Sequence, residues 1–321
     1  MCSAVERMAT GGPRREIMTK LDIIAFAGAS NWPVWAGQAR GFFAEQGLEL
    51  TLTLTPNSRH MARALHSGTA AIALSSIDNV IAYASGQGEE PLGETADFFA
   101  FMGVDDGLLS LMTQPGVETP AQLRGGTLAV DALTTGYAFV LKEIMRRAGM
   151  SERDVTYKAV GTGAERLQAL KDGNCAATLL NAPLCLAAEG AGSVRLLSAR
   201  SILGPYQGIV GAARRSFAQA HPELIVRFIS AFHRSLAWLG DPSNKAEACA
   251  ILAEKLPAVR AVLDEAYRML VTEGGLARNL AIDPAGADCV IALRRRHGPG
   301  GQELGTADRY IDDGFRQLAL A

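Results

Sequence analysis

The sequence has few cysteines and no cysteine spacing typical of a disulfide framework or a zinc site. The five cysteines are an odd number without a Cys-x-x-Cys pair, at Cys2, Cys175, Cys185, Cys249 and Cys289. The histidines offer no ligand pair, because His60 and His66 would lie about 240° apart around a helix. We therefore expect neither a metal nor another cofactor.

An excess of positive charge is also missing. The chain has 31 Lys and Arg against 33 Asp and Glu, a net charge of -2. The arginine runs at 214–215 and 294–296 are short, and we expect the second to lie on the solvated face of a late helix. A nucleic-acid partner is therefore not expected.

The sequence lacks a long apolar segment. Residues 1–20 contain charges and glycines where an export signal needs an apolar stretch of about 7–15 residues. The stretch 176–188 is interrupted by Thr178, Asn181 and Pro183 and is shorter than the ~20 residues of a membrane helix. We expect a disordered tail over 1–20 and a cytoplasmic location as written, or a periplasmic one if an upstream export signal is missing from this sequence.

Strand and helix patterns alternate with short connections, which is typical of βαβ units and a parallel sheet. The first series has a strand at 21–26, a helix at 36–47, a strand at 48–54, a helix capped by Asn57 or Ser58, and a strand near 70–75. A second series follows, with helices opened by Thr119, by Thr134 or Thr135, and by Thr162. The segments ALHSGTAAIALSS (64–76) and ALKDGNCAATLLN (169–181) repeat one helix-end, glycine and strand pattern, one in each series. Two lobes of one architecture are therefore predicted.

The chain returns after the second series. The segment 206–214 has the pattern of a strand, and amphipathic helices follow it to the C-terminus. The chain must then cross between lobes twice, near 104–106 and near 205–206, and two crossings make a hinge. We predict lobe 1 over 21–104 and 206–321, and lobe 2 over 105–205.

Four blocks carry a resemblance to a known family: WPVWAGQARGFFAEQGLEL, ALHSGTAAIA, PGVETPAQLRGGTLAV and RLQALKDGNCAATLLNAP. They resemble the solute-binding proteins of nitrate, sulfonate and taurine ABC importers, related to thiamin-pyrimidine synthases, over about 21–240. The resemblance implies a type II periplasmic-binding-protein fold: two Rossmann-like lobes, a two-crossing hinge and a helical C-terminus. It also implies a small-molecule ligand, an ABC permease as partner if the chain is exported, and a monomer. The chain departs from the family at Ala71 and Ala176, where an acidic residue is usual, and in lacking a visible export signal.

Ligands of such sheets sit beyond the carboxyl ends of the strands, where helix N-termini present free N–H groups. The loops there are rich in hydroxyl, amide and aromatic groups and poor in charge. This composition favours a small polar or anionic molecule with a flat or apolar part. Together with the resemblance, it implies a ligand such as a sulfonate, an aromatic carboxylate or a pyrimidine. The candidate ligand-binding residues are Ser30, Asn31, Trp32, Asn57, Ser58, Ser75, Ser76, Thr134, Thr135, Tyr137 and Asn181. Trp35 and Arg59 are weaker candidates, and for Asp78 and Asp131 capping or loop hydrogen bonding is the favoured role.

A cytosolic lyase or synthase on the same fold is the alternative function. SNWPV resembles the nucleophile loop of a sulfinate desulfinase, but Trp32 stands where that family has cysteine, which excludes that mechanism. His60 is the candidate general base of this alternative, because it lies near the start of its helix.

Overall fold

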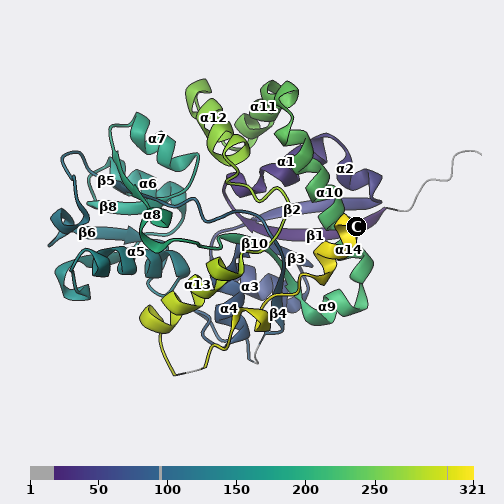
Figure 1. The fold of residues 1–321 in the computed structure, drawn as a ribbon, viewed down its shortest axis with the longest axis horizontal. Helices are drawn as coiled ribbons and strands as arrows, with labels where there is room; N and C mark the ends of the chain where they lie inside the picture. The colour runs from purple at the N-terminus through teal and green to yellow at the C-terminus, as the bar shows by residue number, and fades with distance from the viewer. Residues whose placement is uncertain (1–17, 94–95, 302) are drawn as a thin grey trace, which may run out of the picture.

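The computed structural model describes residues 18–93, 96–301 and 303–321 and contains two five-stranded sheets with helices packed around them (Figure 1). The first sheet has the order β2-β1-β3-β10-β4, with β1 (Thr19–Phe26), β2 (Leu48–Thr55), β3 (Ile72–Ser76), β4 (Phe98–Gly103) and β10 (Ile209–Arg214). The second has the order β7-β6-β8-β5-β9, with β5 (Ser110–Thr113), β6 (Thr127–Val130), β7 (Thr156–Ala159), β8 (Ala177–Leu180) and β9 (Val194–Ser198). The predicted two-lobed α/β architecture is confirmed, with the first lobe on the right of Figure 1 and the second on the left.

Both sheets are mixed, so the prediction of parallel sheets is wrong for part of each. β1 pairs in parallel with β2 and β3, and β6 with β7 and β8. β10 runs antiparallel to β3 and β4, and β5 runs antiparallel to β8 and β9. β5 and β10 each follow a crossing from the other lobe and complete no βαβ unit, so no crossover helix fixes their direction.

The first predicted helix is broken into two. α1 (Trp32–Ala39) and α2 (Phe42–Glu45) are separated at Gly41, which has a φ of 75°. Glycine populates this left-handed region without the steric cost that a Cβ brings. α1 also begins at Trp32, before the predicted start at 36, so Trp32 lies in its first turn and not in the preceding loop.

Three predicted helix starts, one in the first lobe and two in the second, are confirmed. Asn57 caps α3 (Ser58–Ser67), Thr135 caps α5 (Gly136–Arg147), and Thr162 opens α6 (Gly163–Lys171) with a capping box. The capping box at Thr119 opens only a short 3₁₀ helix, Pro120–Leu123. The remaining helices of this part are α4 (Ile77–Ala84), α7 (Leu184–Gly190) and α8 (Ala199–Leu203).

The repeated segments occupy equivalent places in the two sheets. α3 ends at Gly68 (φ 80°) and leads into β3, while the chain after α6 turns at Gly173 (φ 71°) and leads into β8. β3 pairs in parallel with β1, and β8 with β6. Each segment therefore ends a helix and feeds a strand that lies in the interior of its sheet.

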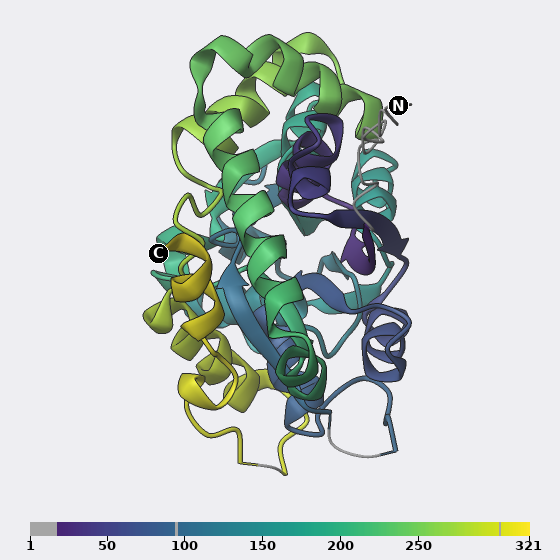
Figure 2. The same cartoon turned by 90° about the vertical axis from the view of Figure 1, so that its right-hand side faces the viewer.

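The C-terminal part is helical, as predicted. Its helices are α9 (Arg215–Ala220), α10 (Pro222–Gly240), α11 (Lys245–Lys255), α12 (Arg260–Tyr267), α13 (Pro284–His297) and α14 (Gly314–Leu320). The long helix α10 packs against α1 and α14 on the first lobe (Figure 2). α13 packs against both α4 of the first lobe and α5 of the second, so it joins the two lobes.

The two crossings run side by side between the lobes. Val104 N–H donates to Ile209 O at 2.9 Å, and Gly208 N–H donates to Asp105 O at 3.2 Å. The strands of the two sheets fall on either side of the predicted lobe boundaries, which stay predictions. Of the tail predicted over 1–20, residues 1–17 lie outside the described residues, whereas Thr19 and Lys20 already belong to β1.

Candidate functional site

A cavity of about 290 Å³ lies between the two lobes at the carboxyl ends of their strands. The first lobe contributes residues that follow β1, β2 and β3, and the second lobe contributes residues that follow β6, β7 and β8. Leu74, Leu109, Leu179 and Ile209 add apolar surface. The cavity is therefore at the place that the strand pattern predicts.

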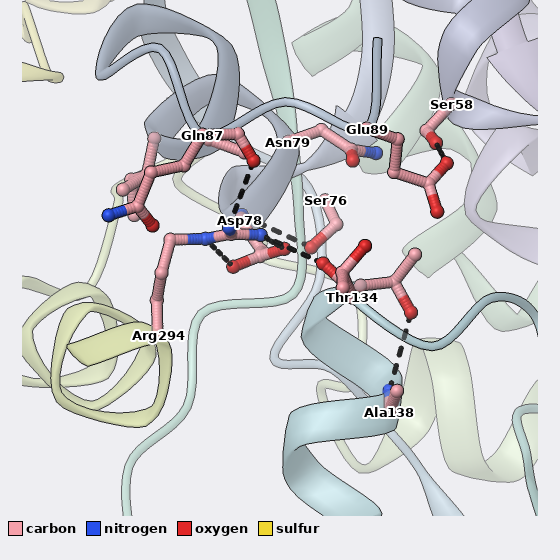
Figure 3. Close-up of polar contacts among 12 residues, drawn as sticks. Ser58, Ser76, Asp78, Asn79, Gln87, Glu89, Thr134, Ala138 and Arg294 are labelled. Atoms are coloured by element: carbon pink, nitrogen blue, oxygen red, sulfur yellow. Dashed lines mark hydrogen bonds and ion pairs between the residues drawn. The ribbon is translucent and has the colours of Figure 1, made fainter. Parts of the chain in front are cut away.

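Eight of the candidate residues line this cavity. They are Ser30, Asn31, Asn57, Ser58, Ser76, Thr135, Tyr137 and Asn181. Three of them also cap helices: Asn57 accepts from His60 N–H at 2.9 Å, Ser76 from Asp78 N–H at 3.2 Å, and Thr135 from Ala138 N–H at 3.4 Å. The N-termini of α3, α4 and α5 therefore face the cavity with their caps in place. Figure 3 shows the cap contact to Ala138 at the start of α5.

Three other candidates do not line it. Trp32 is fully buried in α1, where its indole Nε1–H donates to Ala248 O at 3.0 Å and its ring meets Tyr267 edge-on. Ser75 is buried and accepts from Asn79 Nδ2 at 3.0 Å. The Thr134 side chain is exposed outside the cavity lining. Packing of α1 accounts for Trp32, and strand alternation turns Ser75 away from its neighbour Ser76.

The weaker candidates also lie elsewhere. Trp35 is buried in α1, and Arg59 is exposed. His60 is exposed on the outer side of α3, beside a shallow surface that it shares with His66. Its ring Nδ1 lies 3.1 Å from Thr55 Oγ1. The candidate general base is therefore not among the residues that line the cavity.

The cavity is richer in charge than the sequence suggests, because Asp78, Glu89, Asp131 and Arg166 all line it. The strand-end loops supply only Asp78 and Asp131, and Glu89 and Arg166 come from segments that these loops do not include, so the expectation of a site poor in charge is wrong. Glu89 follows α4, and Arg166 lies in the first turns of α6. Neither position carries a spacing signal that distinguishes it from a surface charge.

Asp78 forms a buried ion pair with Arg294 of α13 (Figure 3). Arg294 Nε donates to Asp78 Oδ1 at 2.8 Å and Nη2 donates to Oδ2 at 2.6 Å, with both side chains 1% exposed. Arg294 also donates to Gln87 O at 3.5 Å and, across the lobes, to Thr134 O at 3.4 Å. The expectation of a solvated face for 294–296 is wrong at this position. Val290 and Ile291 precede Arg294 at helical spacing, so the buried stripe of α13 was a readable signal.

Arg166 and Asp131 form the charged wall of the second lobe. Arg166 is 6% exposed and is held by backbone carbonyls, with Nε donating to Gly161 O at 3.1 Å and Nη1 donating to Leu179 O. Asp131 accepts from Thr135 Oγ1 at 2.7 Å. Burial raises the pKa of Asp131, and the nearby charge of Arg166 opposes this shift without reversing it.

The described residues contain neither a metal-binding cluster nor a membrane-spanning helix. Within residues 18–93, 96–301 and 303–321, no group of three or more His, Cys, Asp and Glu side chains is placed to hold a metal ion. In the same part of the chain, no helix has the length and apolar character needed to cross a membrane.

A family model described as "NMT1/THI5 like" matches residues 30–245. No curated protein matches the chain in sequence. Solved structures match it over most of its length, with the two-lobed periplasmic-binding-protein fold. The nitrate-binding protein NrtA from Synechocystis PCC 6803 has a TM-score of 0.77 at 13% identity, covering 94% of this chain and 89% of that one.

Two further structures are similar. The alkanesulfonate-binding protein SsuA from Xanthomonas axonopodis pv. citri, bound to MOPS, has a TM-score of 0.71 at 17% identity, with coverage of 91% and 98%. The ligand-binding component of an ABC-type import system from Staphylococcus aureus, with zinc bound, has a TM-score of 0.75 at 13% identity, with coverage of 94% and 99%. At these identities the similarity establishes the fold.

Proposed function

Because the chain belongs to the NMT1/THI5-like family, we propose that it is a solute-binding protein that captures a small polar organic molecule between its lobes for ABC-type import. The observation that carries the proposal is the cavity, which is lined from the strand ends of both sheets. Such a ligand contacts both lobes at once, so its binding favours the state in which they are close together.

The crossings offer a route by which the cavity affects the hinge. Ser30 lines the cavity and its Oγ donates to Asp105 Oδ2 at 2.5 Å. The other oxygen of Asp105 accepts from the backbone N–H groups of Gly107 and Ile209, both at 2.9 Å. One carboxylate therefore connects a cavity residue to both crossings.

An importer's permease would recognise the closed, ligand-bound form, which places the protein on the outer side of the membrane. The monomeric state and the periplasmic location belong to this proposal. Cell fractionation of the native host tests the location directly, because an imported solute must be captured before it crosses the membrane.

The function is tested with purified chain and a broad panel of sulfonates, carboxylates, amines and pyrimidines. A true ligand raises the melting temperature by mass action and reduces the radius of gyration in X-ray scattering. Asn181→Ala, in the cavity, should weaken binding, whereas Asn174→Ala, exposed in the same lobe, should not. If no compound changes either quantity, the proposal is wrong.

The alternative function is a lyase or synthase. Its candidate base, His60, does not line the cavity. Recovering the bound compound unchanged after long incubation would agree with solute binding, and its conversion would favour the enzyme.

A further inference from the structure

Glu89 brings a carboxylate to the first-lobe wall of the cavity, and none of the lysine, arginine and histidine side chains that the structure describes forms an ion pair with it. Among the described residues its recorded hydrogen-bond partner is Ser58, whose Oγ donates to Glu89 Oε2 at 2.6 Å. Figure 3 shows this pair apart from the ion pair of Asp78 and Arg294. The adjacent Glu90 differs, because it pairs with Arg63 at 3.3 Å beside the shallow outer surface.

An unpaired buried hydroxyl lies beside Glu89. Tyr83 is 4% exposed, and its hydroxyl has no hydrogen-bond partner in the described part of the chain. Burial raises the pKa of Tyr83 to about 12, and the neighbouring Glu89 carboxylate adds to this shift. Tyr83 does not line the cavity, so its hydroxyl belongs to the surroundings of Glu89 and is not counted as a ligand contact.

The carboxylates that line the cavity differ in their partners. Arg294 neutralises Asp78 through two hydrogen bonds. Arg166 makes its hydrogen bonds to backbone carbonyls and stands against two carboxylates, Asp131 on its own lobe and Glu89 on the other. Within the described residues, Asp78 therefore has an arginine paired with it, whereas Glu89, the other carboxylate of the first-lobe wall, has none.

We propose that the ligand carries a cationic nitrogen, an ammonium or amidinium group that donates hydrogen bonds to Glu89. This inference rests on the proposed function and specifies its ligand. Carboxylates accept hydrogen bonds from such groups with the added strength of opposite charge. The ring of Tyr137 and the apolar side chains of the cavity take up the carbon skeleton, and Arg166 remains available to an anionic end if the molecule has one.

The test uses pairs of compounds that differ in one group. Benzylamine is compared with benzyl alcohol, and 3-aminopropanesulfonate with 3-hydroxypropanesulfonate, by calorimetry on the intact chain. The ammonium member of a pair that binds should bind at least about tenfold more tightly than the hydroxyl member. Glu89→Gln should abolish this difference, and Glu90→Gln, the matched control outside the cavity, should leave it intact.

The inference is overturned if the hydroxyl compounds bind as well as the ammonium compounds, or if Glu89→Gln leaves the preference unchanged. It is also overturned if no amine stabilises the protein while another solute of the broad panel does, in which case the proposed function stands. If no solute of any class is bound, the proposed function itself is wrong, so the two failures are distinguishable.

Discussion

Arg294 connects the C-terminal helix α13 to both lobes. It reaches from α13 to Asp78 on α4 and to the carbonyl of Thr134 just before α5. Removing one partner of a buried ion pair leaves an uncompensated charge, which costs about 3–5 kcal/mol. We expect Arg294→Met to lower the free energy of unfolding by about this amount, measured by urea denaturation.

Two further variants test whether the loss of stability comes from the buried ion pair. Arg296→Met removes an exposed arginine of the same helix and should cost less than about 1 kcal/mol. The double variant Asp78→Leu with Arg294→Met should lose less than the two single changes together, because no charge is left unpaired. Equal losses for Arg294→Met and Arg296→Met would contradict the structural role.

At the scale of residues, the sequence predicted the hydroxyl and amide groups of the cavity better than its charges. Asn57, Ser76 and Thr135 stand where a strand gives way to a helix, so the strand pattern and the capping preference both identify them. Glu89 and Arg166 have no such local signature, because only the approach of the two lobes brings them to one cavity. Trp32 was a candidate because an aromatic ring near a strand end can pack on a ligand, yet in α1 its ring is buried against Tyr267.

At the scale of elements, the crossings depend on a buried carboxylate. Burial raises the pKa of Asp105 above its ordinary 3.8, against the opposing effects of its hydrogen bonds from Ser30, Ile209 and Gly107. A raised pKa in the folded state means that the folded protein holds this proton more tightly than the unfolded chain. The stabilisation is complete below the ordinary value and is lost as the pH rises through the raised pKa.

Asp105→Asn should remove this pH dependence while keeping an oxygen that accepts from the backbone of both crossings. The free energy of unfolding of the parent should therefore fall relative to the variant as the pH rises from about 4. Denaturation at several pH values measures the difference, and Asp22→Asn, an exposed position on β1, provides the control. A difference that is constant with pH would show that Asp105 is not perturbed by burial.

The helix caps and the helix-ending glycines could be predicted from the sequence, because each depends on a few neighbouring residues. Thr162 with Glu165 and Gly68 with its positive φ are examples. β4 and β5 were not predicted, because each is buried along its whole length and carries no alternating pattern. Their place is fixed by the strands that pair with them across long stretches of sequence.

At the scale of the whole molecule, the number of lobes and the two crossings followed from the order of the elements. The antiparallel insertion of β5 and β10 did not, since it depends on where each crossing enters the other sheet. The position of α13 between the two lobes could not be predicted from the sequence either. Besides the ion pair of Arg294 with Asp78, α13 makes a second polar contact, to α5. His297 of α13 lies 3.0 Å from Glu143 of α5, whose pKa is lowered chiefly by its hydrogen bond from Arg146.

The lobes pack closely at Gly136 in the first turn of α5, and this packing leads to a last prediction. A Cβ at this position would lie 2.7 Å from Asp78 Cβ and 2.8 Å from Asp78 Cγ, which belong to the other lobe. Such distances are too short for carbon atoms in contact, so Gly136→Ala must separate α5 from α4. Since alanine favours helix formation more than glycine does, α5 itself is not weakened.

We expect Gly136→Ala to have a larger radius of gyration than the parent and a weaker affinity for any ligand that bridges the lobes. Affinity falls because only the closed fraction of the protein binds fully. Gly190→Ala is the matched control, because a Cβ at Gly190 on α7 meets no atom within 4 Å. If Gly136→Ala scatters and binds like Gly190→Ala, then closure does not need the contact between α4 and α5, and the ligand must be held mainly by one lobe.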